Sequence, residues 1–206
     1  MKFYLSSYKI GNETDKLKAL APANKKAAYI PNALDYSTDL ERRKESEEND
    51  MAQLKNVGLD VEQLDLRDYF GKKEDLKKKL DEFGVIWARG GNVFVLRQAM
   101  KLSGFDTILK ELIDKKADML YGGYSAGVCV LAPSLKGMDI VDDVNAKPYE
   151  DKETVWEGLN IIDYVIEPHY KSEHPESELV NKEIEYMIDN KILFKALRDG
   201  EVITIE

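Results

Sequence analysis

The chain has 206 residues, of which 43% are hydrophobic, and its 30 basic and 39 acidic side chains give a formal net charge of −9. This length and apolar content predict a single domain over residues 1–206, and the acidic balance argues against a broad phosphate-binding face, so nucleic acid is not an expected partner. The sole cysteine, Cys129, excludes an internal disulfide framework and a thiolate zinc site. The sequence offers neither a signal-peptide core nor a membrane-spanning segment, which predicts a cytoplasmic protein without membrane contact.

Short β-rich runs alternate with longer charged segments of helical period along most of the chain. Strands are predicted within residues 2–7, 26–31, 61–66, 84–91 and 118–124. Helices are predicted over residues 40–57 and around Leu76, Leu80 and Phe83, where apolar side chains recur at spacings of three and four. This alternation predicts an α/β fold, a three-layer sandwich with a mostly parallel central sheet.

The last quarter of the chain continues the same pattern. A strand is predicted to end at Pro168, a helix to cover residues 177–190, and two strands to flank a turn at Asp199 and Gly200. The chain stops on the second of these strands without a polar tail, which leaves open that a final strand or hairpin is missing.

The segment Gly123-Tyr124-Ser125-Ala126-Gly127 fits the pattern G-x-S-x-G, between a predicted strand and a predicted helix. A sharp strand-to-helix turn leaves little room for neighbouring side chains, so small residues are needed around a serine that is thrust outward. The free N–H groups at the start of the helix would face an oxyanion formed beside the serine. Ser125 is therefore a candidate nucleophile; the alternative is an ordinary turn with a capping serine.

A second oxyanion donor is needed close to the serine. The run Arg89-Gly90-Gly91-Asn92 follows another predicted strand, and a glycine lets the backbone approach a reacting carbonyl closely. We expect the N–H groups of Gly91 and Ala126 to form the oxyanion hole. The glycine pair is also compatible with a plain strand-to-helix turn.

A serine hydroxyl needs a base, and the chain has two histidines. His169 follows Pro168 at the carboxyl end of a predicted strand, where open α/β sheets gather their site residues. His174 lies in a polar stretch and is expected to be a surface histidine. His169 is therefore the candidate base.

Several of these motifs together resemble peptidase E, the aspartyl dipeptidase family of serine peptidases, with the cyanophycinases as more distant relatives. The resemblance rests on the sequences GGN, YSAG with Pro133 eight residues after the serine, PHY and ALRDG, and it covers nearly the whole chain. It implies a fold like that of the class I glutamine amidotransferases, which is flavodoxin-like, with serine in place of their cysteine. It also implies Ser125 as nucleophile and His169 as base.

The acid that orients the histidine has two candidate positions. Asp199 is the first choice, because relatives carry a glutamate there and a carboxylate at a strand end would face the same sheet edge as His169. Asp139 is the alternative, since an acid about fifteen residues after the serine has also been considered in this family, and Asp142 and Asp143 lie in the same predicted loop.

Two positions depart from the family pattern and bear on substrate binding. Aspartyl dipeptidases of this family pair the substrate carboxylate with an arginine shortly after the catalytic histidine, where the alignment places Glu178 here. An acid cannot fill that role. Arg89 stands where relatives carry another glycine, so it is the candidate cation beside the oxyanion turn.

The sequence thus predicts a serine-type peptidase that hydrolyses small peptides, needs no metal or organic cofactor, and is a monomer or a homodimer. Strict cleavage of Asp-X dipeptides is not expected, because Glu178 would repel a carboxylate. Two alternatives stay open: an esterase-type α/β hydrolase, in which the histidine usually follows the acid in the chain, and a non-catalytic or regulatory protein that kept the fold. An unpaired Ser125 would favour the latter.

Overall fold

The computed structural model describes residues 1–151 and 153–206. Its strands are β1 (Lys2–Ser6), β2 (Lys26–Ile30), β3 (Asp60–Gln63), β4 (Val85–Ala88), β5 (Leu120–Tyr124), β6 (Val165–Glu167), β7 (Phe194–Ala196) and β8 (Val202–Ile205). Its α-helices are α1 (Thr14–Leu20), α2 (Leu40–Asn56), α3 (Lys73–Leu80), α4 (Val93–Ser103), α5 (Phe105–Asp114), α6 (Ala126–Cys129) and α7 (Ser177–Asp189). Three short 3₁₀ turns are η1 (Asn32–Leu34), η2 (Leu66–Tyr69) and η3 (Met138–Ile140).

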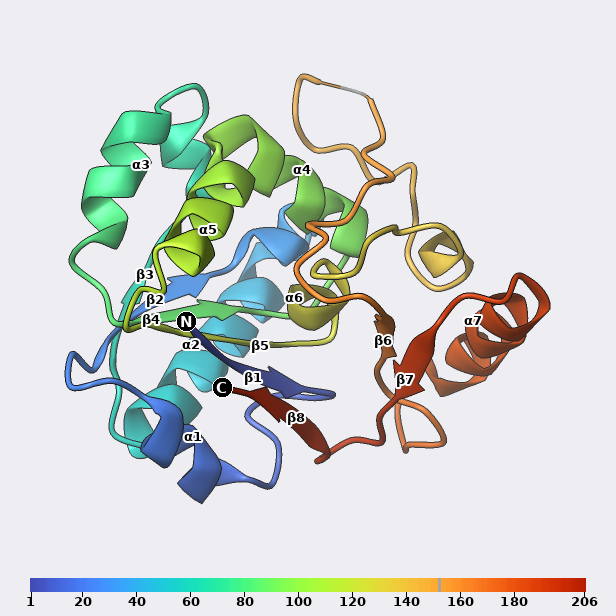
Figure 1. The fold of residues 1–206 in the computed structure, drawn as a ribbon. Coiled ribbons are helices and arrows are strands. Elements are labelled where there is room, and N and C mark those ends of the chain that lie inside the picture. The colour runs from blue at the N-terminus through green and yellow to red at the C-terminus, as the bar shows by residue number, and fades with distance from the viewer. Residues whose placement is uncertain (152) are drawn as a thin grey trace.

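Six strands form the main sheet in the order β3-β2-β4-β5-β1-β8. The strands are parallel except β8, which runs antiparallel to β1 at one edge. Helices α3, α4 and α5 lie on one face and α1 and α2 on the other (Figure 1). The predicted three-layer α/β sandwich is confirmed.

The inner strands of the main sheet, such as β2 and β4, are buried on both faces because helices cover both. Along β2, Ala28 and Ile30 belong to the apolar cluster on the α4 side, whereas Ala27 and Tyr29 belong to the cluster under α1 and α2. Every one of these four side chains is fully buried. The short apolar runs of the sequence therefore read correctly as interior parallel strands.

A second, two-stranded sheet lies beside the main one, and α7 packs near it (Figure 1). It pairs β6 with β7 in parallel, with Glu167 opposite Ala196. The two strands predicted around Asp199 and Gly200 are present as β7 and β8, but they do not pair with each other: β7 joins β6, and β8 crosses to β1. The segment between them, which carries Asp199, therefore connects the two sheets.

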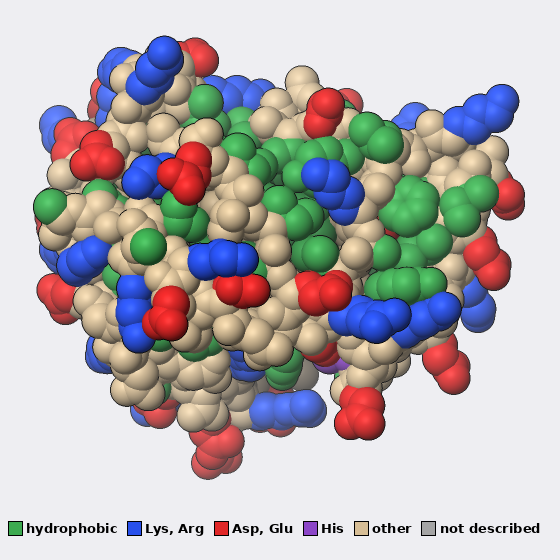
Figure 2. Space-filling model, turned by 60° about the horizontal axis from the view of Figure 1, so that its bottom comes forward, with side chains coloured by type: hydrophobic (Ala, Val, Ile, Leu, Met, Phe, Trp, Pro, Cys, Tyr) green, Lys and Arg blue, Asp and Glu red, His purple; other side chains and the backbone are tan. Residues whose placement is uncertain are grey.

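Charged side chains of both signs are interspersed on the face of the molecule drawn in Figure 2, with apolar side chains between them. No large patch of lysine and arginine interrupts this mixture on that face. No helix among the described residues is both long enough and apolar enough to cross a bilayer.

Candidate active site

Ser125 stands at the turn between β5 and α6 in a strained backbone conformation, with φ 49° and ψ −123°. Non-glycine residues rarely adopt a positive φ, and such strain persists only where the surroundings enforce it. A Cβ atom at Gly123 or Gly127 would lie 2.5 or 2.1 Å from the carbonyl oxygen of Ala88 in β4, so neither position has room for a side chain. The small residues of G-x-S-x-G are thus explained by contact with the neighbouring strand.

Two backbone N–H groups lie beside the serine. Gly91, with φ 141°, donates no hydrogen bond within the described residues and lines a cleft together with Ser125. Ala126 is the first residue of α6, so its N–H has no intrahelical acceptor. Because α6 is only four residues long, these local N–H groups would contribute more to binding an anion beside Ser125 than the helix dipole would.

His169 and Asp199 form a hydrogen-bonded pair, with Nδ1 of the imidazole 2.7 Å from Oδ1 of the carboxylate. Each residue follows one strand of the small parallel sheet, β6 for the histidine and β7 for the aspartate, so the carboxyl ends of adjacent strands bring them together. The hydrogen bond leaves Nδ1 as donor and Nε2 with its lone pair free. This is the orientation that a general base requires.

Ser7, just beyond the end of β1, ties this pair to the main sheet. Its hydroxyl accepts the backbone N–H of His169 at 2.9 Å and donates to Oδ1 of Asp199 at 2.9 Å. Its carbonyl oxygen accepts the backbone N–H of Ser125 at 3.2 Å. Ser7 by itself therefore contacts Ser125, His169 and Asp199.

Ser125 and His169 line the same two cavities, a cleft of about 190 Å³ and a small inner pocket of about 20 Å³. The Nε2 atom of His169 is buried and has no hydrogen-bond partner among the described residues. The Ser125 hydroxyl donates no hydrogen bond to Nε2 of His169. Ser125 and His169 are therefore not hydrogen-bonded to each other in this structure; catalytic hydrogen bonds are often long or absent when no substrate is bound.

The environment of His169 favours the neutral imidazole. Burial lowers its pKa first, and the neighbouring His174 lowers it further, while Asp199 acts in the opposite direction. His174 is not the surface histidine that the sequence suggested: its ring stacks on that of His169 with centroids 3.7 Å apart. The polar stretch after β6 folds back over the base instead of running into solvent.

Arg89 is buried, with 5% of its surface exposed, and it lines the cleft together with Ser125. Its Nη2 donates to Ser46 at 3.1 Å and lies 3.7 Å from the carboxylate of Asp50. Its Nη1 is buried without a partner. Asp50 in turn accepts the hydroxyls of Tyr29 and Tyr124 at 2.9 and 2.6 Å, so the guanidinium is held by a buried network.

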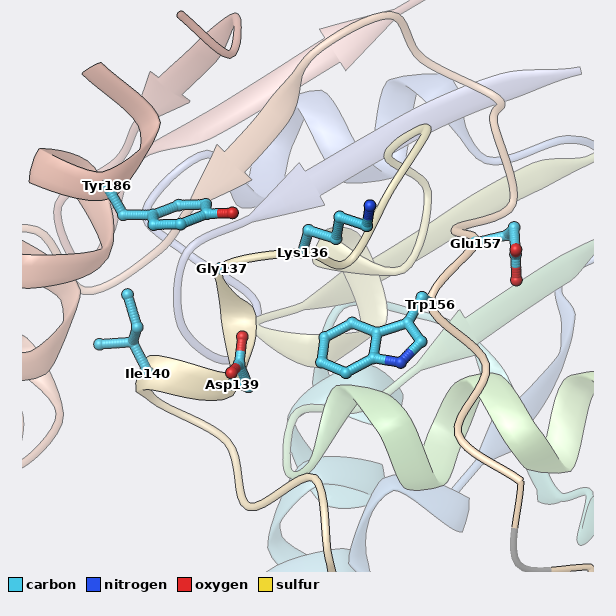
Figure 3. Close-up of a pocket in the computed structure, with 7 residues that line it drawn as sticks. All are labelled: Lys136, Gly137, Asp139, Ile140, Trp156, Glu157 and Tyr186. Carbon is cyan, nitrogen blue, oxygen red and sulfur yellow. The ribbon is translucent and has the colours of Figure 1, made fainter. Parts of the chain in front are cut away.

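The alternative acid, Asp139, makes no contact with His169. It belongs to η3 and lines a separate cavity of about 510 Å³, where Figure 3 shows it facing the hollow with Trp156 and Tyr186. Asp142, three residues later, does line the inner pocket with Ser125 and His169, but its carboxylate accepts the N–H of Val93 at 2.7 Å. Its position at the start of α4 is that of a helix cap.

Glu178 is exposed on the first turn of α7 and does not line either of the two cavities beside Ser125. Glu176, two residues earlier, lines both. The nearest acid to the cleft is therefore Glu176, and the substrate-facing role expected of Glu178 has no geometric support.

Buried carboxyl groups gather behind the inner pocket. Burial raises the pKa of Asp142 to about 7, and it also raises the pKa of Glu183 on α7. Burial raises the pKa of Glu167, the last residue of β6, to about 8, although its side-chain hydrogen bond with Glu183 acts in the opposite direction; the same hydrogen bond adds to the rise of the pKa of Glu183. The pair therefore retains a proton where isolated carboxyls would have lost it.

Ser7, Asp50 and Glu176 were not expected from the sequence. The serine and Asp50 lie in ordinary strand and helix contexts, so no local motif marks them. Only the pairing of β1 with β5 and the packing of α2 under the sheet bring them to the site. Glu176 lies in the same polar stretch as His174, and nothing in that stretch indicates a fold back over His169.

The family model "Peptidase family S51" matches residues 8–206. The chain is 32% identical over 130 residues to the "Uncharacterized peptidase Lmo0363" of Listeria monocytogenes, and 29% identical over 119 residues to the "Uncharacterized peptidase Lin0382" of Listeria innocua. These alignments cover 63% and 58% of this chain and only 59% and 54% of those relatives.

Solved structures agree on the fold. The "Putative Peptidase E Protein" of Listeria monocytogenes EGD-e superposes with a TM-score of 0.72 at 23% identity, covering 100% of this chain and 98% of its own. A peptidase from an acI-B1 Actinobacterium superposes with a TM-score of 0.67 at 16% identity, covering 100% and 83%. With the family model spanning nearly the whole sequence, this chain belongs to peptidase family S51, a family of serine peptidases.

Proposed function

We propose that this protein hydrolyses small peptides with Ser125 as nucleophile, His169 as general base and Asp199 as the acid that orients the base. One observation carries the assignment: the 2.7 Å contact from Asp199 to Nδ1 of His169 leaves Nε2 free on the cavities that Ser125 lines. The strained backbone of Ser125 adds support, because such strain accumulates at functional positions.

In the proposed reaction, Oγ of Ser125 attacks the peptide carbonyl carbon while its proton passes to Nε2 of His169. The carbonyl oxygen becomes an oxyanion that the N–H groups of Gly91 and Ala126 stabilise. The intermediate collapses, the C–N bond breaks, and the leaving amine takes the proton from His169. Water then hydrolyses the acyl-enzyme by the same base. None of these steps requires a cofactor.

The imidazole has to be neutral to accept the proton. Since burial and His174 lower the pKa of His169, the base stays neutral to a lower pH than an exposed histidine would. Protonation of Asp199 would remove the charge that stabilises the imidazolium, so the carboxylate form is the working one.

Arg89 is the proposed contact for a substrate carboxylate. Its Nη2 already lies 3.7 Å from Asp50, but its buried Nη1 has no hydrogen-bond partner, and leaving a buried polar group unsatisfied is costly. A carboxylate entering the cleft can therefore accept a hydrogen bond from Nη1 without displacing another group. On the other side of His169, Glu176 offers a carboxyl group toward the same cleft. The cleft of about 190 Å³ favours short peptides over long chains.

A non-catalytic protein that kept the fold is the second candidate, and one observation favours it: Ser125 makes no hydrogen bond to His169 among the described residues. Reaction with a fluorophosphonate separates the two candidates. We expect a mass increase that maps to Ser125 in the native protein, and no adduct in Ser125→Ala or after His169 is changed to Gln.

Activity on a dipeptide panel completes the test. Ser125→Ala should lower turnover by several powers of ten with an unchanged circular dichroism spectrum, as expected when one member of a triad is removed. Undiminished hydrolysis by a pure Ser125→Ala preparation would exclude the proposed nucleophile, and an unlabelled native protein without activity would support the second candidate.

A further inference from the structure

Three side chains that can bind metals converge at the mouth of the cleft: His169, His174 and Glu176. One ligand atom from each lies within 4.8 Å of the others. Oε2 of Glu176 is 4.0 Å from Nε2 of His169 and 3.8 Å from Nδ1 of His174. The first histidine is almost fully buried, whereas His174 and Glu176 keep 18% and 42% of their side-chain surface exposed, so an ion can enter from solvent.

The state of His169 suits a metal ligand. Its Nδ1 is engaged by Asp199, which fixes the tautomer with the lone pair on Nε2, and that atom is buried without a partner. A carboxylate behind a histidine whose other nitrogen is free is the outer-shell arrangement found around metal-bound histidines. The structure thus prepares Nε2 to bind either a proton or a cation.

We propose that His169, His174 and Glu176 form a site for Zn²⁺ or a similar divalent transition metal, and that the bound ion blocks the active site reversibly. Two imidazoles and one carboxylate are a ligand set that suits zinc and disfavours Mg²⁺, which prefers oxygen ligands. A fourth position is left for water, as in other three-ligand zinc sites.

Binding requires a local movement of His174. A tetrahedral zinc ion with bonds of about 2.1 Å needs donor atoms roughly 3.4 Å apart, so the present separations of 3.8 and 4.0 Å require a small closure. The stacked rings also have to part, because their planes differ by only 7° and their lone pairs do not converge. His174 lies in the turn-rich segment before α7, so its rotation disturbs no strand, but it has to break the 3.3 Å hydrogen bond that Nδ1 of His174 accepts from the backbone N–H of Glu176.

Metal binding and catalysis would both use the same atom, Nε2 of His169. A metal bound to Nε2 occupies the lone pair that would receive the Ser125 proton, so the ion and the base function exclude each other. Occupation also places a second cation in the cleft that Arg89 lines. Inhibition by the ion rests on the proposed function, but metal binding itself does not.

Titration calorimetry with Zn²⁺ alone tests the site without reference to activity. We expect one ion per chain on the native protein and on Ser125→Ala, with no comparable binding of Mg²⁺. His174→Ala and Glu176→Gln should each weaken Zn²⁺ binding by about tenfold or more. The exposed Glu173 in the same segment provides the matched control, and Glu173→Gln should bind as the native protein does.

X-ray absorption of the zinc-loaded native protein adds a measurement that needs no variant and should show two imidazole ligands. If the native protein hydrolyses peptides, Zn²⁺ should inhibit it and a chelator should restore the rate. Equal Zn²⁺ affinity in native protein and His174→Ala, or a spectrum without two imidazoles, would overturn the site. A native protein that binds Zn²⁺ as expected but hydrolyses no peptide without the ion would instead count only against the proposed function.

Discussion

The proposed nucleophile and the proposed base come from two differently built parts of the molecule. Ser125 lies on the main sheet, where β5 is buried between β4 and β1, and its conformation is enforced by contacts with the adjacent strand. His169 and Asp199 follow the strands of the separate sheet β6–β7, which is only three residues long on each side (Figure 1). The first region is fixed by close backbone packing in the middle of the main sheet; in the second, β6 is buried in the same apolar core, but His169 and Asp199 are positioned by hydrogen bonds to each other and to Ser7.

Ser7 is the point at which these regions meet. Its backbone carbonyl holds Ser125, and its hydroxyl contacts the backbone of His169 and the carboxylate of Asp199. The residues that it joins are 162 and 192 positions away along the chain. The proposed nucleophile is therefore held by backbone contacts within the main sheet, whereas the proposed base and acid are aligned by hydrogen bonds that join the small sheet to the end of β1.

The largest effect is expected from breaking the base–acid side. Asp199→Asn should lower kcat/KM by roughly 100- to 10,000-fold, because the amide no longer stabilises the imidazolium and can hold the wrong tautomer. Asp139→Asn is the matched change in the other candidate acid and should have little effect, since Asp139 lines a separate cavity. Steady-state kinetics on one good dipeptide substrate measures both.

The assignment reverses if Asp139→Asn is the more damaging of the two. Thermal melting of both variants should accompany the kinetics, because Asp199 also accepts the hydroxyl of Ser7 and a loss of folding would imitate a loss of catalysis.

An intermediate effect is expected on the nucleophile side, at the proposed carboxylate contact. Arg89→Ala should lower kcat/KM for aspartyl dipeptides by about 10- to 100-fold, because a buried ion pair with the substrate is lost, and should affect neutral dipeptides less. Glu178→Ala should leave the selectivity unchanged, because Glu178 is exposed and away from the cleft. A dipeptide panel with acidic, neutral and basic N-terminal residues measures the selectivity.

If aspartyl dipeptides are cleaved efficiently by both native protein and Arg89→Ala, another cation binds the carboxylate. A change in selectivity with Glu178→Ala would show that α7 approaches the substrate more closely than in this structure.

The last effect concerns not activity but stability, in the buried carboxyl groups behind His169. Burial raises the pKa of Glu183, so the folded protein keeps a proton that the unfolded chain releases above its ordinary carboxyl pKa. The contribution of Glu183 to the free energy of unfolding is therefore fully present at acidic pH and is lost as the pH rises toward the pKa of the folded state. The free energy of unfolding falls by about 1.4 kcal/mol per pH unit for one retained proton. Glu183→Gln keeps a hydrogen-bond donor for Glu167 but has no carboxyl proton that can dissociate.

Urea unfolding at a series of pH values between about 5 and 8 measures this difference. As pH rises, the free energy of unfolding of Glu183→Gln should increase relative to that of the native protein. Glu185→Gln, on the exposed face of the same helix, should follow the native curve. Parallel curves for native protein and Glu183→Gln would mean that Glu183 is ionised in the folded state.

Much of the fold was predictable from local patterns. The inner parallel strands β1, β2, β4 and β5 appear as short, mostly apolar runs because both of their faces are covered. The strand-serine-helix turn is visible because only small residues fit beside Ala88. The pairing of β7 with β6 was not predictable, since a turn at Asp199 and Gly200 suggests a hairpin, while the actual partners are distant in sequence. The fold of residues 170–176 over His169 was missed for the same reason.

The sequence by itself determined the fold class, because strand order and apolar runs are visible locally. It also made Ser125 and His169 candidates through their places at the ends of predicted strands, whereas the first choice of Asp199 drew on the family resemblance as well. Only the tertiary structure decided that Ser7 joins the site, that His174 stacks on the base, that Arg89 is buried with a free Nη1, and that Glu176 rather than Glu178 borders the cleft. These depend on contacts between distant segments, whose geometry no local pattern encodes.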